Sequence, residues 1–330
     1  MGDKNFKVKN LSVSFSDDNG KIIAVDDVSF KLEKGKIFGV IGESGCGKST
    51  LGLSIMRLLP DKISKIEQGE ILFNGKDLAK FKETELEDLR GDEIAMIFQE
   101  PMTSLNPLFK IGRQIGEPLK IHKHLRGKHL KEKVIELLNK VQIPNPEKVY
   151  GLYPHNLSGG MRQRVMIAMA LSCEPEILIA DEPTTALDVT IQAQILFLIK
   201  KLNRDVKTSI IFITHDLSIV AEICDEVIVM YGGRIVEQSD IYELFDNPKH
   251  PYTRGLLESQ PGKGEYGKPL SSIKGMVPSF SNMPIGCSFS TRCCEKFYER
   301  CSNEKPKLLN IGDKHKVACW LYDKEEGNIE

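Results

Sequence analysis

Residues 42–50 read GESGCGKST and match G-x-x-x-x-G-K-[ST], the pattern of a loop that binds phosphate groups. A short apolar run at 36–42 precedes the loop and helix-like spacing at 48–59 follows it, which is the strand–loop–helix context that the pattern requires. Its glycines let backbone N–H groups point at a phosphate, and the helix adds its positive N-terminal end. The predicted nucleotide-binding residues here are Gly42, Ser44, Gly45, Cys46, Gly47, Lys48, Ser49 and Thr50.

Two side chains in this loop have separate predicted tasks. Lys48 pairs with the β- and γ-phosphates of a nucleoside triphosphate, and the Ser49 hydroxyl ligates Mg²⁺. Cys46 needs no role beyond its small size. The alternative, a glycine-rich turn without a ligand, is disfavoured by the flanking strand and helix.

Two carboxylates follow the apolar run ILIA at 177–180, so a buried strand delivers them to the carboxyl edge of a sheet. We expect Asp181 to ligate Mg²⁺ directly or through its hydration shell, and Glu182 to polarise an attacking water as a general base. A simpler alternative is a pair of solvated acids that cap a strand. The more serious alternative is phosphate binding without hydrolysis.

The elements that position these residues follow from the hydrophobic pattern. A run at 11–16 alternates with period two, and the apolar runs at 36–42, 176–181 and 209–216 have the length of buried strands. Helix-like stretches separate the later runs, which indicates a parallel sheet with helices on its faces and ligands at the carboxyl ends of the strands. The predicted fold is an α/β core of the P-loop NTPase (RecA-like) class.

Two segments depart from this alternation. Between about 101 and 158 the strands stop, and LKEKVIELLNKV at 130–141 has the spacing of an amphipathic helix, which predicts an inserted α-helical subdomain. After about residue 236 the Pro and Gly content rises and periodicity fades. We therefore place a nucleotide-binding domain at 1–240 and an irregular C-terminal extension at 241–330.

The stretch LSGGMRQR at 157–164 lies between the phosphate loop and ILIADE, and this order resembles the ATP-binding subunits of ABC transporters. Other motifs of that family occur in sequence. Gln99 in MIFQEP resembles the Q-loop glutamine, TALD at 185–188 the D-loop, and His215 in ITHD the switch histidine. The resemblance covers about residues 6–240.

This resemblance implies how the remaining motifs act on ATP. Ser158, Gly159 and Gly160 precede a helix-like run and can offer a hydroxyl, N–H groups and a helix N-terminus to a phosphate. In the family, two subunits pair head to tail, so that each signature closes on the ATP held by the phosphate loop of its partner. The resemblance also assigns Gln99 to catalysis and Mg²⁺ binding, and His215 to sensing the γ-phosphate.

Phe15 matches the aromatic position that stacks on adenine in this family. However, Leu11, Val13 and Phe15 alternate on one face of a predicted strand and suit a hydrophobic core equally well. Both interpretations stay open from the sequence.

Several stretches resemble one subfamily, the ATPase subunits of dipeptide and oligopeptide importers, a group that includes nickel importers. They are the phosphate loop, FQEPMTSLNP at 98–107, YPHNLSGGMRQRVMIAMAL at 153–171, HPYTRGLL at 250–257 and the terminal cysteines. The resemblance implies a motor subunit that drives separate transmembrane permease subunits, while an extracytoplasmic binding protein delivers the substrate. It places residues 101–109 and the helical insertion against the permease, although their apolar side chains can instead pack beneath the insertion's own helices.

Residues 286–301, GCSFSTRCCEKFYERC, contain four cysteines, and Cys319 follows in VACW. Four thiolates can hold either zinc or a 4Fe–4S cluster, and the short C-x₂₋₄-C knuckles that structural zinc usually prefers are absent. The resemblance implies an iron–sulfur cluster, with zinc as the alternative, and it assigns as ligands Cys287, Cys293, Cys301 and Cys319. We expect the metal to stabilise an extension that has little apolar core.

Composition restricts the function classes. Lys and Arg number 45 against 46 Asp and Glu, so the basic field of a nucleic-acid binder is absent, and we expect no nucleic acid partner. The start MGDKNFKVKN lacks a secretory signal, and no apolar run approaches the about 18 residues that span a bilayer. We expect a peripheral protein on the cytoplasmic face of the membrane. The alternatives are a soluble ABC ATPase acting on nucleic acid or ribosomes, and a redox-gated module.

Overall fold

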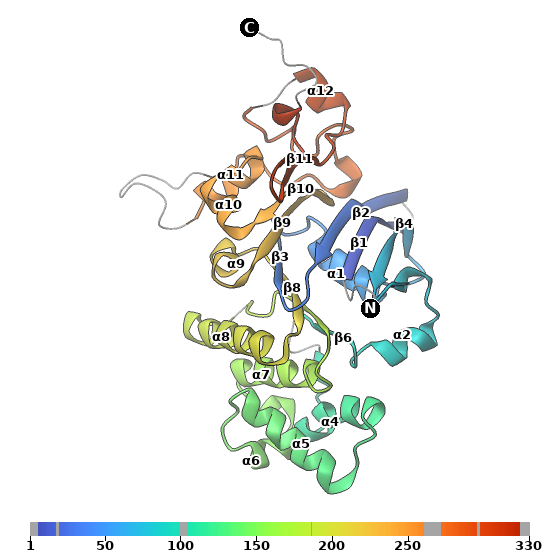
Figure 1. Cartoon of the computed structure of the whole chain (residues 1–330), viewed down its shortest axis with the longest axis vertical. Coiled ribbons are helices and arrows are strands. Elements are labelled where there is room, and N and C mark those ends of the chain that lie inside the picture. Colours follow the sequence, from blue (N-terminus) through green and yellow to red (C-terminus); the bar gives the residue numbers. More distant parts are fainter. Residues whose placement is uncertain are drawn as a thin grey trace. The chain divides into compact units, whose positions relative to one another are not determined.

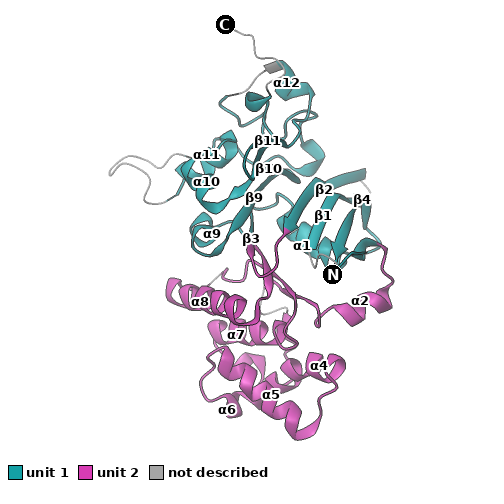
Figure 2. Cartoon of the chain, viewed as in Figure 1, with its two compact units in different colours: residues 1–31, 38–79, 214–330 teal, residues 32–37, 80–213 magenta. Residues whose placement is uncertain are grey.

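The computed structural model describes residues 6–17, 20–99, 104–185, 187–260, 272–295 and 298–323. The chain divides into two compact units (Figure 2). Unit 1 comprises Met1–Lys31, Phe38–Ala79 and Thr214–Glu330, and unit 2 comprises Leu32–Ile37 and Lys80–Ile213. Among the described residues, no helix is both long and apolar enough to cross a membrane.

An antiparallel sheet forms the N-terminal part of unit 1. Its strands, in spatial order, are β2 (Gly20–Leu32), β1 (Phe6–Asp17), β4 (Ser64–Phe73) and β5 (Lys76–Asp77). The predicted strand at 11–16 is confirmed within β1, where Leu11 and Val13 are fully buried. Ser12 and Ser14, which alternate with them on the opposite face, are also buried, so both faces of β1 are covered at 11–14.

A second group of strands in unit 1 carries the phosphate loop and the C-terminal region. In spatial order they are β11 (Leu309–Gly312), β12 (His315–Val317), β10 (Arg234–Asp240), β9 (Glu226–Tyr231) and β3 (Ile37–Ile41). β3 pairs with β9 in parallel, and the other neighbours pair antiparallel. The phosphate loop leads from β3 into α1 (Lys48–Ile55), as predicted, and α9 (Leu217–Ile223) precedes β9 (Figure 1).

Unit 2 contains a parallel set of strands. They are β8 (Ser209–Thr214), β7 (Ile177–Asp181) and β6 (Ile94–Ile97), with β7 in the middle. Every residue of β7 and β8 is buried, which explains why both read as continuous apolar runs instead of alternating ones. The predicted strands at 176–181 and 209–216 are therefore confirmed.

The described part of unit 2 also contains helices. They are α2 (Glu83–Leu89), α4 (Ile111–His122), α5 (Gly127–Lys140), α6 (Pro146–Tyr150), α7 (Gly159–Ala170) and α8 (Val189–Val206). The helix predicted at 130–141 is α5, which buries Val134, Leu137 and Leu138 along one face. Short 3₁₀ turns occur in both units at Leu78–Lys80, Pro154–Asn156, Phe280–Asn282 and Trp320–Tyr322.

The C-terminal region is more regular than its sequence indicates. It contains α10 (Ile241–Asp246), α11 (Pro251–Glu258), α12 (Tyr298–Asn303) and the β11–β12 hairpin. Asp240 and His250 cap α10 and α11 by accepting hydrogen bonds from Glu243 N and Tyr252 N. These elements are shorter than the 11 to 18 residues over which periodicity is read, so the prediction of an irregular extension was wrong for them.

Candidate functional site

The phosphate loop in unit 1 depends on two glycines that no other residue can replace without strain. Gly42 and Gly47 have φ angles of 155° and 99°, which L side chains rarely adopt. A Cβ atom on Gly42 would collide with the Met230 carbonyl oxygen and lie 2.7 Å from Cys46 Sγ. A Cβ atom on Gly47 would collide with the Ala24 carbonyl oxygen. The loop therefore lies tightly against neighbouring backbone, and its glycines are needed for that conformation.

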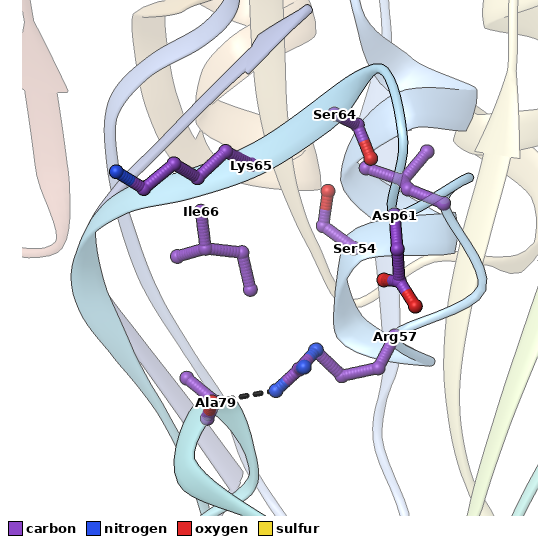
Figure 3. Close-up of a pocket in the computed structure, with 8 residues that line it drawn as sticks. Ser54, Arg57, Asp61, Ser64, Lys65, Ile66 and Ala79 are labelled. Carbon is purple, nitrogen blue, oxygen red and sulfur yellow. Dashed lines mark hydrogen bonds between the residues drawn. The ribbon is translucent and has the colours of Figure 1, made fainter. Parts of the chain in front are cut away.

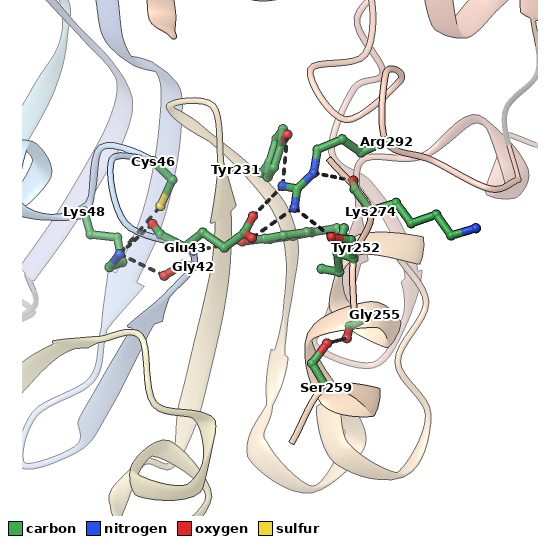
Figure 4. A network of polar contacts seen from close by, with 11 residues as sticks. Gly42, Glu43, Cys46, Lys48, Tyr231, Tyr252, Gly255, Ser259, Lys274 and Arg292 are labelled. Carbon is green, nitrogen blue, oxygen red and sulfur yellow. Dashed lines mark hydrogen bonds and ion pairs between the residues drawn. The ribbon is translucent and has the colours of Figure 1, made fainter. Parts of the chain in front are cut away.

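Lys48, the first residue of α1, is only 5% exposed. Its Nζ donates to the carbonyl oxygens of Gly42 and Glu43, each at 2.9 Å, and lies 3.8 Å from Cys46 Sγ (Figure 4). The ammonium is thus held inside the curve of the loop by acceptors that phosphate oxygens can replace. Burial raises the pKa of the Cys46 thiol, so this side chain stays neutral beside the lysine.

The other nucleotide contacts predicted in unit 1 differ in how exposed they are. Ser44 and Gly45 are exposed at the tip of the loop, and Ser49 and Thr50 are half-buried in the first turn of α1. Phe15 is half-buried on β1, whereas Leu11 and Val13 are completely buried. His215 follows β8 and is exposed.

A carboxylate centre in unit 2 lies at the end of β7. Asp181 and Glu182 are 4% and 8% exposed. The Glu182 carboxylate accepts hydrogen bonds from Gln99 Nε2 at 3.0 Å and from Thr185 Oγ1 at 2.8 Å. Its backbone N–H donates to Ile213 O at 2.9 Å. Two neutral donors thus fix the orientation of this carboxylate, as a positioned general base requires.

The backbone at Glu182 is strained, with a φ of 45° in a residue that is not glycine. Such a conformation costs on the order of 1–3 kcal/mol and persists only where surrounding contacts enforce it. Thr185, which helps to enforce it, was missed by the sequence analysis. Its signal was a hydroxyl three residues after the predicted base, within TALD; Ala186 of that motif lies outside the described residues.

The signature residues form the start of α7 in unit 2. Ser158 is the N-cap, and its hydroxyl accepts from Met161 N at 3.3 Å. A Cβ on Gly159 would meet no atom within 4 Å, whereas one on Gly160 would lie 2.8 Å from Ile191 Cγ2. The N-terminus of this twelve-residue helix therefore faces open space at Gly159, where its N–H groups can receive an anion.

The four cysteines predicted as ligands line one small cavity in unit 1, together with His250 and Phe289. They are Cys287, Cys293, Cys301 and Cys319. Burial, with the mutual repulsion of the thiolates, raises the pKa of Cys287 to about 11 and that of Cys319 to about 12. Cys294 is exposed and does not line the cavity.

These thiols do not form a ready metal site. Among the residues that the structure describes, no group of three or more His, Cys, Asp or Glu side chains is placed to hold a metal ion. The predicted iron–sulfur cluster and its zinc alternative therefore have no formed metal site among these residues.

A separate pocket of about 250 Å³ in unit 1 is lined by mixed charges, including Arg57, Asp61 and Lys65 (Figure 3). Arg57 follows the C-terminal end of α1 and donates to the carbonyl oxygens of Leu78 and Ala79. None of the predicted nucleotide contacts lines this pocket, because the phosphate loop lies at the opposite end of α1.

Comparison with known proteins matches this combination of motifs to named families. Residues 25–185 match the family described as ABC transporter, and residues 236–301 match the one described as oligopeptide/dipeptide transporter, C-terminal region. The chain is 50% identical to the oligopeptide transport ATP-binding protein AppD of Bacillus subtilis, over 97% of both chains. It is 49% identical to a probable peptide ABC transporter ATP-binding protein of Sinorhizobium fredii, over 95% of this chain and 93% of that protein.

Solved structures give the same result for the fold. The dimeric ATP-binding cassette MJ0796, in a post-hydrolysis state with ADP and phosphate, is similar with a TM-score of 0.65 and 28% identity over 72% of this chain and 98% of that one. The predicted α/β P-loop NTPase fold is confirmed by this similarity. With half of its residues identical to a relative along almost the whole length, the chain belongs to the ABC transporter family, among the ATP-binding proteins of peptide transporters.

Proposed function

We propose that this chain is the ATP-hydrolysing subunit of an ABC importer for dipeptides or oligopeptides. The observation that carries the proposal is the buried Glu182 carboxylate, held by Gln99 and Thr185 in a family whose members bind ATP. Substrate class rests on the matching C-terminal region and on relatives named as dipeptide and oligopeptide transport proteins.

The predicted side chains have different roles in binding and hydrolysing ATP. Lys48 exchanges its carbonyl acceptors for phosphate oxygens, and Gly42 and Gly47 let the loop adopt the conformation that points its N–H groups at a phosphate. Ser49, Asp181 and Gln99 supply oxygen ligands of the type that Mg²⁺ prefers. Mg²⁺, when bound, neutralises charge on the phosphate oxygens. Glu182 accepts a proton from the water that attacks the γ-phosphorus, and ADP leaves as the bond to the γ-phosphate breaks.

The remaining predicted contacts complete this assignment. Ser158, Gly159 and Gly160 bind the γ-phosphate of ATP held by a second ATPase subunit, supported by the open N-terminus of α7. His215 senses the γ-phosphate of the ATP bound at the phosphate loop, and Phe15, which is half-buried, stacks on adenine. We retain the division into a nucleotide-binding domain at 1–240, with its helical subdomain at about 101–158, and an extension at 241–330.

The proposed partners are transmembrane permease subunits, a second ATPase subunit and, indirectly, an extracytoplasmic binding protein, with this chain on the cytoplasmic face of the membrane. The test is ATP hydrolysis in proteoliposomes that contain the permease, with binding protein loaded with dipeptide, oligopeptide or Ni²⁺. We expect stimulation by a loaded peptide. Stimulation by nickel alone would reassign the substrate, and stimulation by RNA or DNA without permease would refute transport.

We also propose that the four cavity cysteines hold a 4Fe–4S cluster in the loaded protein. The support is that Cys287, Cys293, Cys301 and Cys319 line one cavity, while Cys294 does not. Cluster binding would release the thiol protons and stabilise the surrounding segment. Protein purified without oxygen should contain about four irons per chain. Cys301→Ser should lose them and Cys294→Ser should keep them, whereas colourless wild-type protein with stoichiometric zinc would disprove iron.

A further inference from the structure

Two residues of the C-terminal region bind Glu43, a residue of the phosphate loop that lies between Gly42 and Ser44 (Figure 4). Tyr252 Oη accepts a hydrogen bond from Glu43 N at 2.8 Å. The Arg292 guanidinium pairs with both carboxylate oxygens of Glu43, with Nη1–Oε2 at 2.6 Å and Nη2–Oε1 at 3.1 Å. Glu43 is thus fixed through its backbone and its side chain by residues more than 200 positions away in the chain.

The side chains of Arg292 and Tyr252 are both buried and make further contacts. The Arg292 side chain is 4% exposed, and it also donates to Tyr231 Oη at 3.4 Å and to the carbonyl oxygens of Ile273 and Lys274 at 3.5 and 3.1 Å. Tyr252 is completely buried. Bidentate pairing of a guanidinium with a carboxylate is strong and geometrically specific, so the position of Glu43 is closely determined.

Glu43 also contacts the phosphate-binding lysine, Lys48. The Glu43 carbonyl oxygen is one of the two acceptors of Lys48 Nζ, at 2.9 Å. Glu43, which Arg292 and Tyr252 bind, therefore also helps to position the Lys48 ammonium group. Displacement of Glu43 would shift this carbonyl and the N–H groups that follow it in the loop, and phosphate binding requires those groups to be preorganised.

The same residues lie next to the thiol cavity. Arg292 precedes Cys293, whose side chain lines the cavity with Phe289. The Phe289 ring lies 5.3 Å from that of Tyr252 and 5.2 Å from that of Tyr231, between ring centroids. Phe289 thus packs against both the cavity and Tyr252, so a change in side-chain packing at the cavity can reach Glu43 through adjacent residues.

We propose that Arg292 and Tyr252 are positioning residues for nucleotide binding, through which the C-terminal region sets the affinity of the phosphate loop for ATP. This inference rests on the proposed ATP-binding function. The competing explanation is that the contacts only fasten the C-terminal region to unit 1. If that explanation holds, mutation of either residue lowers the unfolding temperature and does not selectively weaken nucleotide binding.

The experiment measures the Kd and KM for Mg·ATP, kcat and the unfolding temperature in full-length variants. Arg292→Gln removes the bidentate pair, and Tyr252→Phe removes a single oxygen atom. Matched controls in the same region are Arg254→Gln, which breaks the pair with Glu295, and Tyr322→Phe, which removes a hydrogen bond to Lys249 O. The ion pair of Arg254 and the hydrogen bond of Tyr322 both lie outside the phosphate loop.

We expect Arg292→Gln and Tyr252→Phe each to raise the Kd and KM for ATP about five-fold or more, the lower range of coupling between sites, with kcat nearly unchanged. The controls should leave both constants within about two-fold of wild type. Because the Arg292 effect acts through one carboxylate, Arg292→Gln combined with Glu43→Gln should weaken binding no more than the stronger single change.

Wild-type affinity in both variants, with unfolding temperatures lowered as in the controls, would overturn the inference and leave only a fastening role. Should Arg292→Gln fail to fold, Tyr252→Phe decides the question alone, because it preserves the ring and its packing. Failure of the proposed function has a different signature, since the wild-type chain itself would then bind no ATP.

Discussion

Replacing Glu182 by glutamine removes the proposed base while keeping the shape of the side chain. The carboxylate is 8% exposed and accepts from Gln99 and Thr185, and a glutamine oxygen can accept from the same donors. Folding and ATP binding should therefore persist. Loss of a positioned general base slows turnover by about 10²- to 10⁴-fold. That range corresponds to about 3–5 kcal/mol of transition-state stabilisation.

Phosphate release at saturating Mg·ATP measures this effect, and equilibrium binding of a fluorescent ATP analogue shows whether affinity is retained. Dimers should accumulate on ATP and be visible by size-exclusion chromatography. Thr185→Val is the matched control, because it removes one 2.8 Å hydrogen bond to Glu182 and leaves the base. We expect it to lower turnover by about five- to ten-fold, the worth of one hydrogen bond. Turnover of Glu182→Gln within ten-fold of wild type would refute the assignment.

Lys48→Ala should weaken ATP binding itself, since it removes the charge held inside the loop, and wild-type affinity by equilibrium titration would contradict this. Gly47→Ala should abolish ATP binding and lower the free energy of unfolding by about 1–3 kcal/mol, whereas Gly75→Ala, also at positive φ but in open space, should leave ATP binding intact. Leu108, 79% exposed, should cross-link as cysteine to permease loops more efficiently than cysteine at buried Leu105, and equal failure at both would remove this segment from the interface.

The last of these predictions concerns a segment only partly described. Of its apolar residues, Met102 lies outside the described residues, and Leu105 is buried. Phe109 is half-buried, with the Arg113 guanidinium 3.7 Å from its ring centroid. Leu108 is therefore the residue of this group best placed to meet a partner.

Elements with continuous apolar runs were predictable because burial on both faces leaves a clear signal. β3, β7 and β8 are such strands, and the phosphate loop follows one of them. The sites around Lys48 and Glu182 were predictable for a different reason, because each is marked by a motif of residues that are close together in the sequence. The β11–β12 hairpin was not, because strands of four and three residues give too short a pattern to recognise.

Contacts between residues far apart in the sequence could not be predicted from local sequence patterns. Glu43 and Arg292 are separated by 249 positions, and Tyr252 belongs to a motif recognised only as a subfamily mark. Neither residue has a spacing that points to the phosphate loop. The positive φ of Glu182 was likewise not predictable, because one of the contacts that hold this residue is a hydrogen bond to Ile213 O on a distant strand.

Pairing of β12 with β10 has a consequence for any shortened form of this protein. Glu237 and Gln238 of β10 pair with Val317 and Lys316, and Ala318 N donates to Val236 O at 2.8 Å. The C-terminal hairpin thus covers the outer edge of β10. A chain cut after residue 240 would expose that edge as a template for strands of other molecules. Such a fragment would be prone to aggregation, even though it retains every motif for nucleotide binding.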